Sequence, residues 1–419
     1  MNTKAILMVS YYYDPYMLTA TRNYYLSKIF ADLGYEVHII TRLESTLHSG
    51  IDTRIKLYSI EAWDYRKIAK WLGAKDGITS QIIKNPTLLD KGFHLLLDYP
   101  WNKYIGEGGG FYFHRAIALA KRIIELKNIH FLYSSYRPIN DHLICSEIKD
   151  SFPHVKWIGD FRDVLWWEKS DVHYQQKWLT GMIRKMDLRT AVTVGIAHFW
   201  EKIYQLPFYG MYNGLPDEVI NHPDHNPEKF VINYNGRIYT QFQRADVFFS
   251  VINELIHELP EFKSHVCIKY YGFQTEFWNK WMQEYALGSY SESKFYSPHV
   301  EIVKEQSAAA INLLLTWCND EIQGFIHGKY NEYVLARKPI LCIIEGKMDH
   351  ELADLYHALG NSCIVLNHEE YKMQTREFIL DCFRNWQLNH EKIIPASALT
   401  FYDWSKRTKI ITDYLKMNN

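Results

Sequence analysis

One pattern constrains this sequence most: short apolar runs alternate with segments of helical spacing, and the alternation begins twice. The first start is the apolar run Ala5–Tyr11, followed by helical spacing over Thr21–Leu33 and a second apolar run at Glu36–Thr41. The second start is Val231–Tyr234, followed by helical spacing over Ala245–Glu258. Strands that alternate with helices of this length predict parallel sheets covered by helices on both faces.

The alternation continues after both starts. In the first half, the sequence predicts helices over 111–126, 140–150 and 198–204, and strands over 130–134, 156–160 and 191–194. In the second half, it predicts strands over 266–271, 311–317, 339–344 and 363–366, a helix over 329–336 and a last helix over 404–415. The fold class is therefore α/β, with two doubly wound parallel-sheet domains.

The chain length supports the same division. At 419 residues the chain exceeds the range of about 250 to 300 residues in which a single core stops growing. The polar, proline-containing stretch NHPDHNPEKF, residues 221–230, fits a linker. We predict an N-terminal domain over 1–218, a C-terminal domain over 219–400 and a C-terminal helix within 401–419 that could pack back on the N-terminal domain. The two sheets should present their carboxyl ends to a shared cleft.

Charge and cysteine usage exclude several classes of protein. The net charge of −1 and the pI near 7.0 argue against a nucleic-acid partner, so an anionic ligand must be held by a few placed groups. The six cysteines have neither disulfide-framework nor zinc spacing, which predicts buried free thiols in a reducing compartment. The 19 histidines include no H-E-x-x-H motif, so we expect no metal site.

Location is predicted from what the sequence lacks. The first residues do not form a signal peptide, and no stretch reaches the roughly 18 to 20 apolar residues of a membrane span. We expect a soluble, cytoplasmic protein. The stretch WDYRKIAKWLGAK, residues 63–75, mixes basic and aromatic residues at helical spacing. It suits peripheral contact with the anionic inner face of a membrane, although a plain amphipathic surface helix is the more common case.

The segment GFIHGKYNEYVLARKPIL, residues 324–341, carries the strongest chemical signal. Gly324 and Gly328 allow close backbone approach to a ligand, and a helix that begins near Lys329 favours an anion at its positive end. Glu332, one turn into the helix, could accept hydrogen bonds from the two hydroxyls of a ribose. Read alone, the segment is equally compatible with a solvated helix start.

A second signal lies in NYNGRIYTQFQRAD, residues 233–246. Gly236 and Arg237 follow the first strand of the second domain, and Arg244 precedes the next helix. Both guanidinium groups could converge on a diphosphate. The alternative is that both arginines are ordinary surface residues.

The first domain offers charged residues at the ends of two predicted strands. In WIGDFRDVLWW, Asp160, Arg162 and Asp163 follow a buried strand, where charges need partners or a ligand. In YYYDPYMLTATR, Asp14 and Arg22 could face the cleft. A structural cluster of salt bridges is the alternative for the first segment, and helix capping by threonine accounts for much of the second.

Several segments in this order resemble the family 4 glycosyltransferases of the GT-B fold, and in particular their bacterial capsule and exopolysaccharide branch. The resemblance rests on AILMVSYYYDP with Arg22, LGYEVHIIT, LYSSYRP, GDFRDVLW, YNGLPDE, YNGRIY and GKYNEYVLARKPIL, which together span nearly the whole chain. It implies two Rossmann-like domains and a retaining transfer of a sugar from a UDP- or GDP-sugar without an obligatory metal or bound cofactor. The implied acceptor is a glycan or a lipid-linked sugar in surface polysaccharide synthesis.

The resemblance also implies roles for individual residues. Glu332 resembles the glutamate that holds the donor ribose, and Arg237 matches the arginine at the diphosphate, where Lys329 would assist. The family's second basic position falls on Gln243, so Arg244, the next residue, is the candidate.

The sequence departs from the family at three places. The first glutamate of the family's pair is replaced by Gly324, with Glu321 nearby as a substitute, and this puts the recognition of the donor sugar in question. The glycine-rich first loop is replaced by MLTATR. Arg162 stands where many members have a histidine.

Two further functions remain open at this point. A nucleotide-sugar 2-epimerase would have the same fold, but it needs acidic and histidine groups around the hexose, which the sequence does not reveal. A transferase-like scaffold without activity would explain the missing first glutamate and the missing N-terminal glycines.

Overall fold

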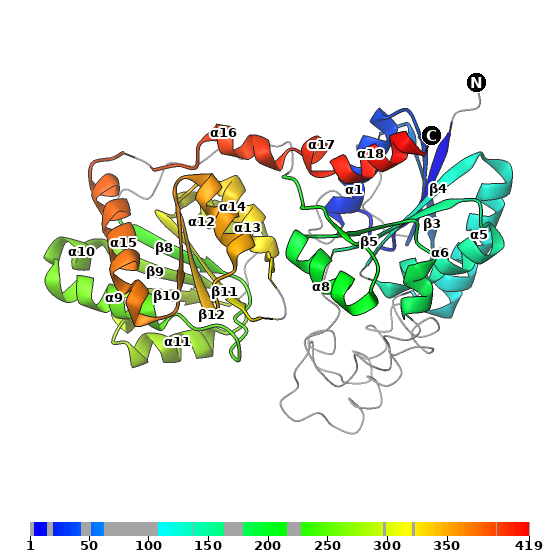
Figure 1. Cartoon of the computed structure of the whole chain (residues 1–419). Coiled ribbons are helices and arrows are strands. Elements are labelled where there is room, and N and C mark those ends of the chain that lie inside the picture. The colour runs from blue at the N-terminus through cyan, green and yellow to red at the C-terminus, as the bar shows by residue number, and fades with distance from the viewer. Residues whose placement is uncertain are drawn as a thin grey trace. The chain divides into compact units, whose positions relative to one another are not determined.

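The computed structural model describes residues 4–14, 20–42, 52–62, 108–136, 138–162, 179–215, 228–295, 299–320, 323–390 and 392–418 (Figure 1). Clustering of contacts divides the chain into one unit of residues 1–213 with 407–419 and a second unit of residues 214–406. The boundary predicted at 218–219 falls outside the described residues. Each unit is a doubly wound parallel sheet, so the predicted α/β fold class is confirmed.

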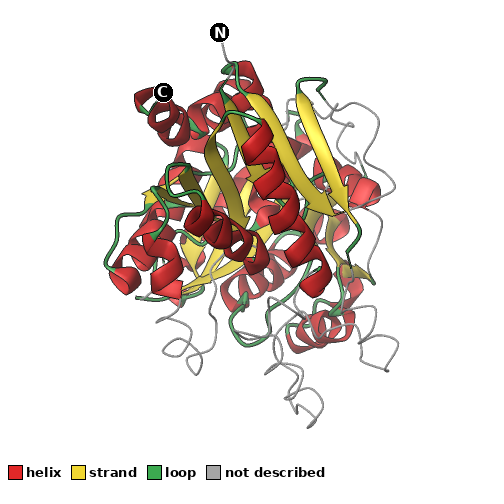
Figure 2. Ribbon diagram, turned by 90° about the vertical axis from the view of Figure 1, so that its right-hand side faces the viewer, coloured by secondary structure: helices red, strands yellow, loops and turns green. Residues whose placement is uncertain are grey.

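The described strands of the first unit form a parallel sheet in the order β3-β2-β1-β4-β5-β6-β7. These strands are β1 (Ala5–Val9), β2 (Glu36–Arg42), β3 (Ile55–Ile60), β4 (Ile129–Tyr136), β5 (Lys156–Phe161), β6 (Leu188–Ala191) and β7 (Tyr209–Gly210). The helices are α1 (Thr21–Asp32), α5 (Gly109–Leu126), α6 (Ile139–Ser151), α8 (Val194–Tyr204) and α18 (Lys409–Met417). Figure 2 shows the strands flanked by helices.

The end of the chain completes the core of the first unit. Ile411 and Leu415 of α18 are fully buried and belong to the same apolar cluster as Phe131 of β4. Tyr414 adds an edge-on ring contact to Phe131, with 6.3 Å between the ring centroids. The first unit is therefore assembled from both ends of the chain.

The strands of the second unit form a parallel sheet in the order β10-β9-β8-β11-β12-β13. These strands are β8 (Phe230–Asn235), β9 (Val266–Tyr271), β10 (Ser291–Lys294), β11 (Ile311–Cys318), β12 (Ile340–Gly346) and β13 (Ser362–Leu366). The α-helices are α9 (Asp246–Glu258), α10 (Pro260–His265), α11 (Thr275–Glu284), α12 (His299–Ala308), α13 (Gly328–Ala336), α14 (His350–Leu359), α15 (Lys372–Gln387), α16 (Ala396–Leu399) and α17 (Trp404–Arg407).

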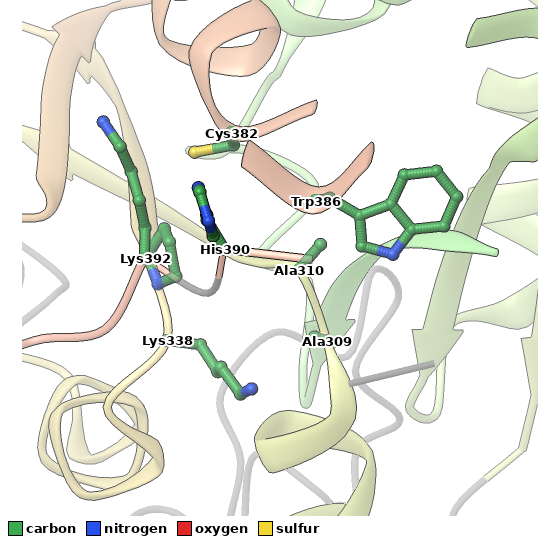
Figure 3. Close-up of a pocket in the computed structure, with 8 residues that line it drawn as sticks. Ala309, Ala310, Lys338, Cys382, Trp386, His390 and Lys392 are labelled. Atoms are coloured by element: carbon green, nitrogen blue, oxygen red, sulfur yellow. The ribbon is translucent and has the colours of Figure 1, made fainter. Parts of the chain in front are cut away.

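A small pocket opens at the amino ends of β11 and β12. Ala309, Ala310, Lys338 and Pro339 line it from the strand starts, and Trp386 lies at its other side (Figure 3). In open parallel α/β sheets, ligands bind outside the carboxyl ends of the strands. This pocket lies at the opposite edge, so it is not our candidate site.

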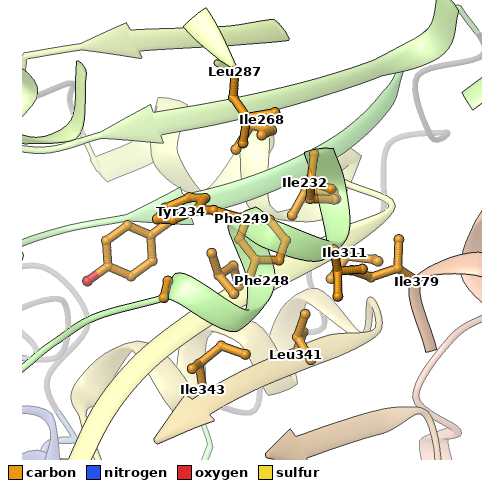
Figure 4. Packing of buried hydrophobic residues seen from close by; sticks show 14 of the residues in the cluster. Ile232, Tyr234, Phe248, Phe249, Ile268, Leu287, Ile311, Leu341, Ile343 and Ile379 are labelled. Atoms are coloured by element: carbon orange, nitrogen blue, oxygen red, sulfur yellow. The ribbon is translucent and has the colours of Figure 1, made fainter. Parts of the chain in front are cut away.

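The core of the second unit is built around β8, which lies inside the sheet. All six residues of β8 are buried, as expected for a strand covered on both faces. Helix α9 buries Phe248, Phe249 and Ile252 in the apolar cluster of this sheet. Figure 4 shows Phe248 and Phe249 among the side chains of that cluster, together with Tyr234. Strand β8 pairs with β9 on one side and with β11 on the other, and the strand order therefore reverses at β8.

Two predicted elements are corrected by the structure. The strand predicted at 191–194 is wrong: β6 ends at Ala191, and α8 begins at Val194 with the Thr193 hydroxyl accepting from the Ile196 amide at 3.2 Å. A threonine in this position ends the strand by capping the helix. The last helix is interrupted at Thr408, so α17 and α18 replace the single helix predicted over 404–415.

All six cysteines are free and buried, as the sequence predicts, while the reducing compartment stays a prediction. Among the described helices, none is both long enough and apolar enough to cross a membrane. The described residues also contain no group of three or more histidine, cysteine or acidic side chains arranged to hold a metal ion.

Candidate functional site

The candidate site lies where the strand order of the second sheet reverses, at the carboxyl ends of β8 and β11. Gly236 directly follows β8, and α13, which follows β11, begins at Gly328. The point of reversal is where open parallel sheets bind ligands. Topology therefore brings together two segments that lie about ninety residues apart in the sequence.

Gly236 and Lys329 are in close contact. Gly236 has a φ of 100°, which residues with a side chain rarely adopt. A Cβ atom placed there would lie 3.2 Å from Cδ and Cε of Lys329 and 3.3 Å from its Nζ. The glycine therefore leaves room for Lys329 to lie directly over the turn that follows β8.

Lys329 is half-buried and has no acidic partner within ion-pair distance among the described residues. Its ammonium group donates to the Tyr234 hydroxyl at 3.0 Å and lies 4.3 Å from the centre of that ring. Burial lowers the pKa of Lys329 to about 7, against the opposing effect of Glu332. An anion bound here would restore the charge interactions that burial removes.

Arg237 is the second cation at this edge. Its guanidinium lies 5.4 Å from the centre of the Tyr239 ring, and within the described ranges no carboxylate comes within ion-pair distance. The Tyr234 hydroxyl, which accepts from Lys329, donates to the Arg237 carbonyl at 3.0 Å. One tyrosine thus holds both cationic segments, and both cations remain available to a ligand.

Glu332 lies one turn after Lys329 on α13. Its Oε2 accepts from Nε2 of Gln306 at 2.9 Å, and its Oε1 lies 3.4 Å from Nε2 of His299. The contact with Glu332 raises the pKa of His299. The side chain of Glu332 is 17% exposed, so the carboxylate is ordered by its neighbours and still reaches solvent.

The loop before α13 is held by a buried aspartate. The Gly324 amide donates to Oδ2 of Asp349 at 2.7 Å, and Oδ1 of Asp349 accepts from the Leu352 amide, which caps α14. Gly324 has a φ of 72°, a conformation that a glutamate would adopt only with strain. The backbone therefore favours glycine where the resembling family has its first glutamate. Glu321, the suggested substitute, lies outside the described residues.

His327 and Gly328 lie where this loop joins α13. Gly328 is the first residue of α13 and is exposed. His327, just before it, bonds to the Thr316 hydroxyl at 3.1 Å, and burial lowers its pKa to about 3. His327 is therefore neutral near pH 7 and adds no positive charge beside Lys329.

The structure does not bring Arg244 to Lys329 by any contact among the described residues. Its guanidinium binds both oxygens of Asp246, at 2.8 and 2.7 Å, and its side chain is 51% exposed. Gln243, the residue before it, is fully buried and donates to the Leu315 carbonyl at 2.6 Å. Gln243 therefore anchors the loop, and Arg244 would have to leave Asp246 to reach a phosphate.

In the first unit, Arg22 and Asp160 form a buried ion pair. Two nitrogens of Arg22 donate to the two oxygens of Asp160, each at 2.8 Å, and a third donates to Asn213 at 2.8 Å. Asp160 also accepts from the hydroxyls of Tyr133 and Thr190. Despite burial, the pKa of Asp160 stays below its ordinary value because Arg22 stabilises the carboxylate. This geometry fits the structural alternative, and a role toward the acceptor stays a prediction.

The other predicted residues of the first unit that the structure describes lie in loops that follow its strands. Asp14 lies in the loop after β1 and is partly exposed. Arg162 follows β5, and its Nε donates to the Tyr136 carbonyl at 3.1 Å. Asp163 and the basic stretch at 63–75 lie outside the described residues.

Tyr234, Asp349 and Gln306 are among the residues of the site that the sequence analysis missed. Tyr234 could have been found, since alternation along β8 places it on one face together with its apolar neighbours. Asp349 carries the signal of an aspartate at a helix start. Gln306 carries none, because no local pattern relates it to Glu332, 26 residues later.

Comparison by sequence finds no family model and no curated protein that matches this chain. Solved structures do match it over nearly the full length of both chains. A sucrose-phosphate synthase from Thermosynechococcus elongatus has a TM-score of 0.60 at 10% identity, covering 99% of each chain. TarM has a TM-score of 0.58 at 12% identity, covering 100% of this chain and 99% of its own. HepE of Anabaena, solved with UDP and glucose, has a TM-score of 0.55 at 12% identity, covering 98% of this chain and 99% of its own.

Identities this low show a shared fold. The strand orders of the two parallel sheets agree with the fold that these matches indicate. The chain has the GT-B fold, built from two doubly wound parallel-sheet units.

Proposed function

We propose that this chain is a retaining glycosyltransferase. It moves a sugar from a UDP- or GDP-sugar to a glycan or lipid-linked acceptor in surface polysaccharide synthesis. One observation carries the proposal: the ammonium group of Lys329 is half-buried at the start of α13, beside Gly236, and has no acidic partner within ion-pair distance among the described residues. A cation held in this way at a strand-order reversal suits a diphosphate.

Proteins of the same fold support the choice of ligand. HepE of Anabaena was solved with UDP and glucose, and TarM of S. aureus was solved with UDP and alpha-GlcNAc-glycerol. A nucleoside diphosphate in this chain would place its phosphates at Lys329 and Arg237 and its ribose at Glu332. The spacing of Lys329 and Glu332, one helical turn apart, fits the length of that ligand.

The proposed reaction breaks the bond between the sugar anomeric carbon and an oxygen of the β-phosphate. The acceptor hydroxyl oxygen bonds to the same carbon on the same face, and its proton passes to the departing phosphate. Negative charge builds on the β-phosphate as the bond breaks, so Lys329 and Arg237 stabilise the transition state more than the bound donor.

We further propose that these two cations supply the charge that a metal ion supplies in other transferases. Turnover should then be unchanged by a chelator such as EDTA. A lipid-linked acceptor would place the enzyme at the inner face of a membrane. In that case the basic stretch at 63–75 is the candidate membrane contact.

Two steps test the proposed function. Thermal unfolding is first measured with UDP, GDP and their sugars, because a ligand at about 100 times its Kd stabilises the native state by about 2.7 kcal/mol. The donor that binds is then incubated with glycan and lipid-linked acceptors, and the anomeric configuration of the product is read by NMR. Product formed from UDP-GlcNAc alone would indicate an epimerase. If no nucleotide stabilises the protein, the remaining candidate is a transferase-like scaffold without activity.

A further inference from the structure

The two hydrogen-bond partners of Glu332 differ in how firmly they are held. Gln306 of α12 is 1% exposed and donates to Oε2 at 2.9 Å. The side chain of His299, at the first residue of the same helix, is 66% exposed and lies 3.4 Å from Oε1. Water can replace an exposed partner at little cost, whereas removal of a buried one leaves a polar group unsatisfied. Gln306 is therefore the fixed partner and His299 the replaceable one.

Gln306 is itself held by a line of buried amides that starts in the middle of the sheet. Nδ2 of Asn233, on β8, donates to Oδ1 of Asn312 at 3.1 Å. Nδ2 of Asn312, on β11, donates to the Gln306 carbonyl at 3.0 Å. Asn233 and Asn312 are fully buried. These two hydrogen bonds join β8 to β11 and β11 to α12, so a shift of one amide disturbs the next hydrogen bond.

The same line reaches the phosphate side of the site. Asn233 also donates to Oδ1 of Asn235 at 2.5 Å, and Asn235 directly precedes Gly236, over which Lys329 lies. Hydrogen bonds that start at Asn233 of β8 thus lead both to Gln306, the partner of Glu332, and to the turn beneath Lys329. A ligand that spans Lys329 and Glu332 meets two groups whose separation is set by this strand.

We propose that Gln306 is a positioning residue for ribose recognition. It holds Oε2 of Glu332, and a ribose hydroxyl takes the place of His299 at Oε1. The inference rests on the proposed function, since it assumes that a nucleoside diphosphate binds at Lys329 and Glu332. It adds that the selectivity for ribose depends on a residue that does not touch the ligand.

The test compares the affinity for UDP with that for 2′,3′-dideoxy-UDP by calorimetry, with GDP and its dideoxy form as a second pair. The wild-type protein should prefer the ribose form by about tenfold or more, because a carboxylate left without its hydroxyl partners loses charge-assisted hydrogen bonds. In Gln306→Leu, this preference should fall to about twofold, while the affinity for the dideoxy form stays unchanged. His299→Ala is the matched control, which should keep the full preference.

A second variant guards against misfolding of the first. Gln306→Glu places a second carboxylate beside Glu332, and repulsion should displace Glu332 and remove the preference above about pH 7. In both variants KM for the donor should rise while kcat changes little, because the ribose is remote from the bond that breaks.

The outcomes distinguish failure of the proposed function from failure of the role of Gln306. If the wild-type protein binds neither nucleotide, the proposed function fails and the inference fails with it. If it binds UDP or GDP without preferring ribose, Glu332 does not read the ribose and the inference is overturned. If it prefers ribose and both Gln306 variants keep that preference, only the role of Gln306 is overturned. Loss of the preference in both Gln306 variants, but not in His299→Ala, is the supporting result.

Discussion

The two units carry charged residues at the same edge of the same kind of sheet, but they use those charges differently. In the first unit, Arg22 is 3% exposed and pairs with the fully buried Asp160, whose oxygens accept from several donors. In the second unit, Lys329 lies beside Tyr234, and the described residues place no acidic partner within ion-pair distance of its ammonium. Breaking a buried and satisfied pair destabilises a fold, whereas an unpaired cation at a strand reversal suits an anionic ligand.

This difference separates stability from function. Charges in the first unit should affect folding, and charges in the second should affect binding and turnover. Substitutions of these charged residues test the division.

The largest effect is expected for Arg22→Met. Removal of one partner leaves Asp160 buried and unpaired, which should lower the free energy of unfolding of the first unit by about 3 to 5 kcal/mol. Lys329→Met should leave the free energy of unfolding unchanged or raise it slightly, since burial of its charge costs energy. Urea denaturation measures both. The double variant Arg22→Met/Asp160→Leu should recover most of the loss. Equal losses in Arg22→Met and Lys329→Met would contradict the comparison.

Turnover should depend on Lys329, although its removal leaves the free energy of unfolding almost unchanged. In Lys329→Met, kcat should fall about 100-fold or more, because one group that stabilises the departing phosphate is lost. The matched control is Lys263→Met, which removes an exposed lysine from α10 in the same unit. Wild-type turnover in Lys329→Met, measured by release of nucleoside diphosphate, would remove this residue from the mechanism.

Arg237 and Arg244 should differ, although both were candidates for the diphosphate. Arg237→Ala should weaken binding of the nucleoside diphosphate by about 1.5 to 3 kcal/mol, the usual range for a hydrogen bond to a charged group. Arg244→Ala should have a smaller effect, because Arg244 is already bound to Asp246. Calorimetry of both variants decides the order. A larger loss in Arg244→Ala would mean that this ion pair opens when the donor binds.

Binding should also depend on pH. Only the protonated form of Lys329 attracts a diphosphate, and burial lowers its pKa to about 7. Affinity for the nucleoside diphosphate should therefore be full below about pH 7 and fall as the pH rises above it, approaching tenfold per pH unit. Lys329→Arg should bind with a flat profile over the same range, because arginine stays protonated. A wild-type profile that is flat from pH 6 to 9 would mean that another group carries the charge.

The sequence predicts the central strands and the helix with Lys329 because both signals are local. The apolar runs at β8 and β11 are long and buried on both faces, and the glycines before Lys329 mark a loop that leads into a helix. Strand β10 is different. Its residues, SESK, are all polar and none of them is buried, and only pairing with β9 makes them a strand.

Contacts between distant residues explain the rest. Arg22 and Asp160 lie 138 positions apart, so the sequence can propose both as cleft residues without showing that they satisfy each other. The same holds for Gln306 and Glu332, which meet only because α12 and α13 pack together. The glycine at 324 is a further example, since its need for a positive φ appears only in the folded loop.

The central claim is that the second unit holds a diphosphate at Lys329 and Arg237, and a crystal structure with bound UDP or GDP tests it most directly. The account predicts phosphate oxygens within hydrogen-bond distance of the Lys329 ammonium and the start of α13, with the ribose hydroxyls at Glu332. A nucleotide bound elsewhere, with Lys329 still paired only with Tyr234, would contradict it.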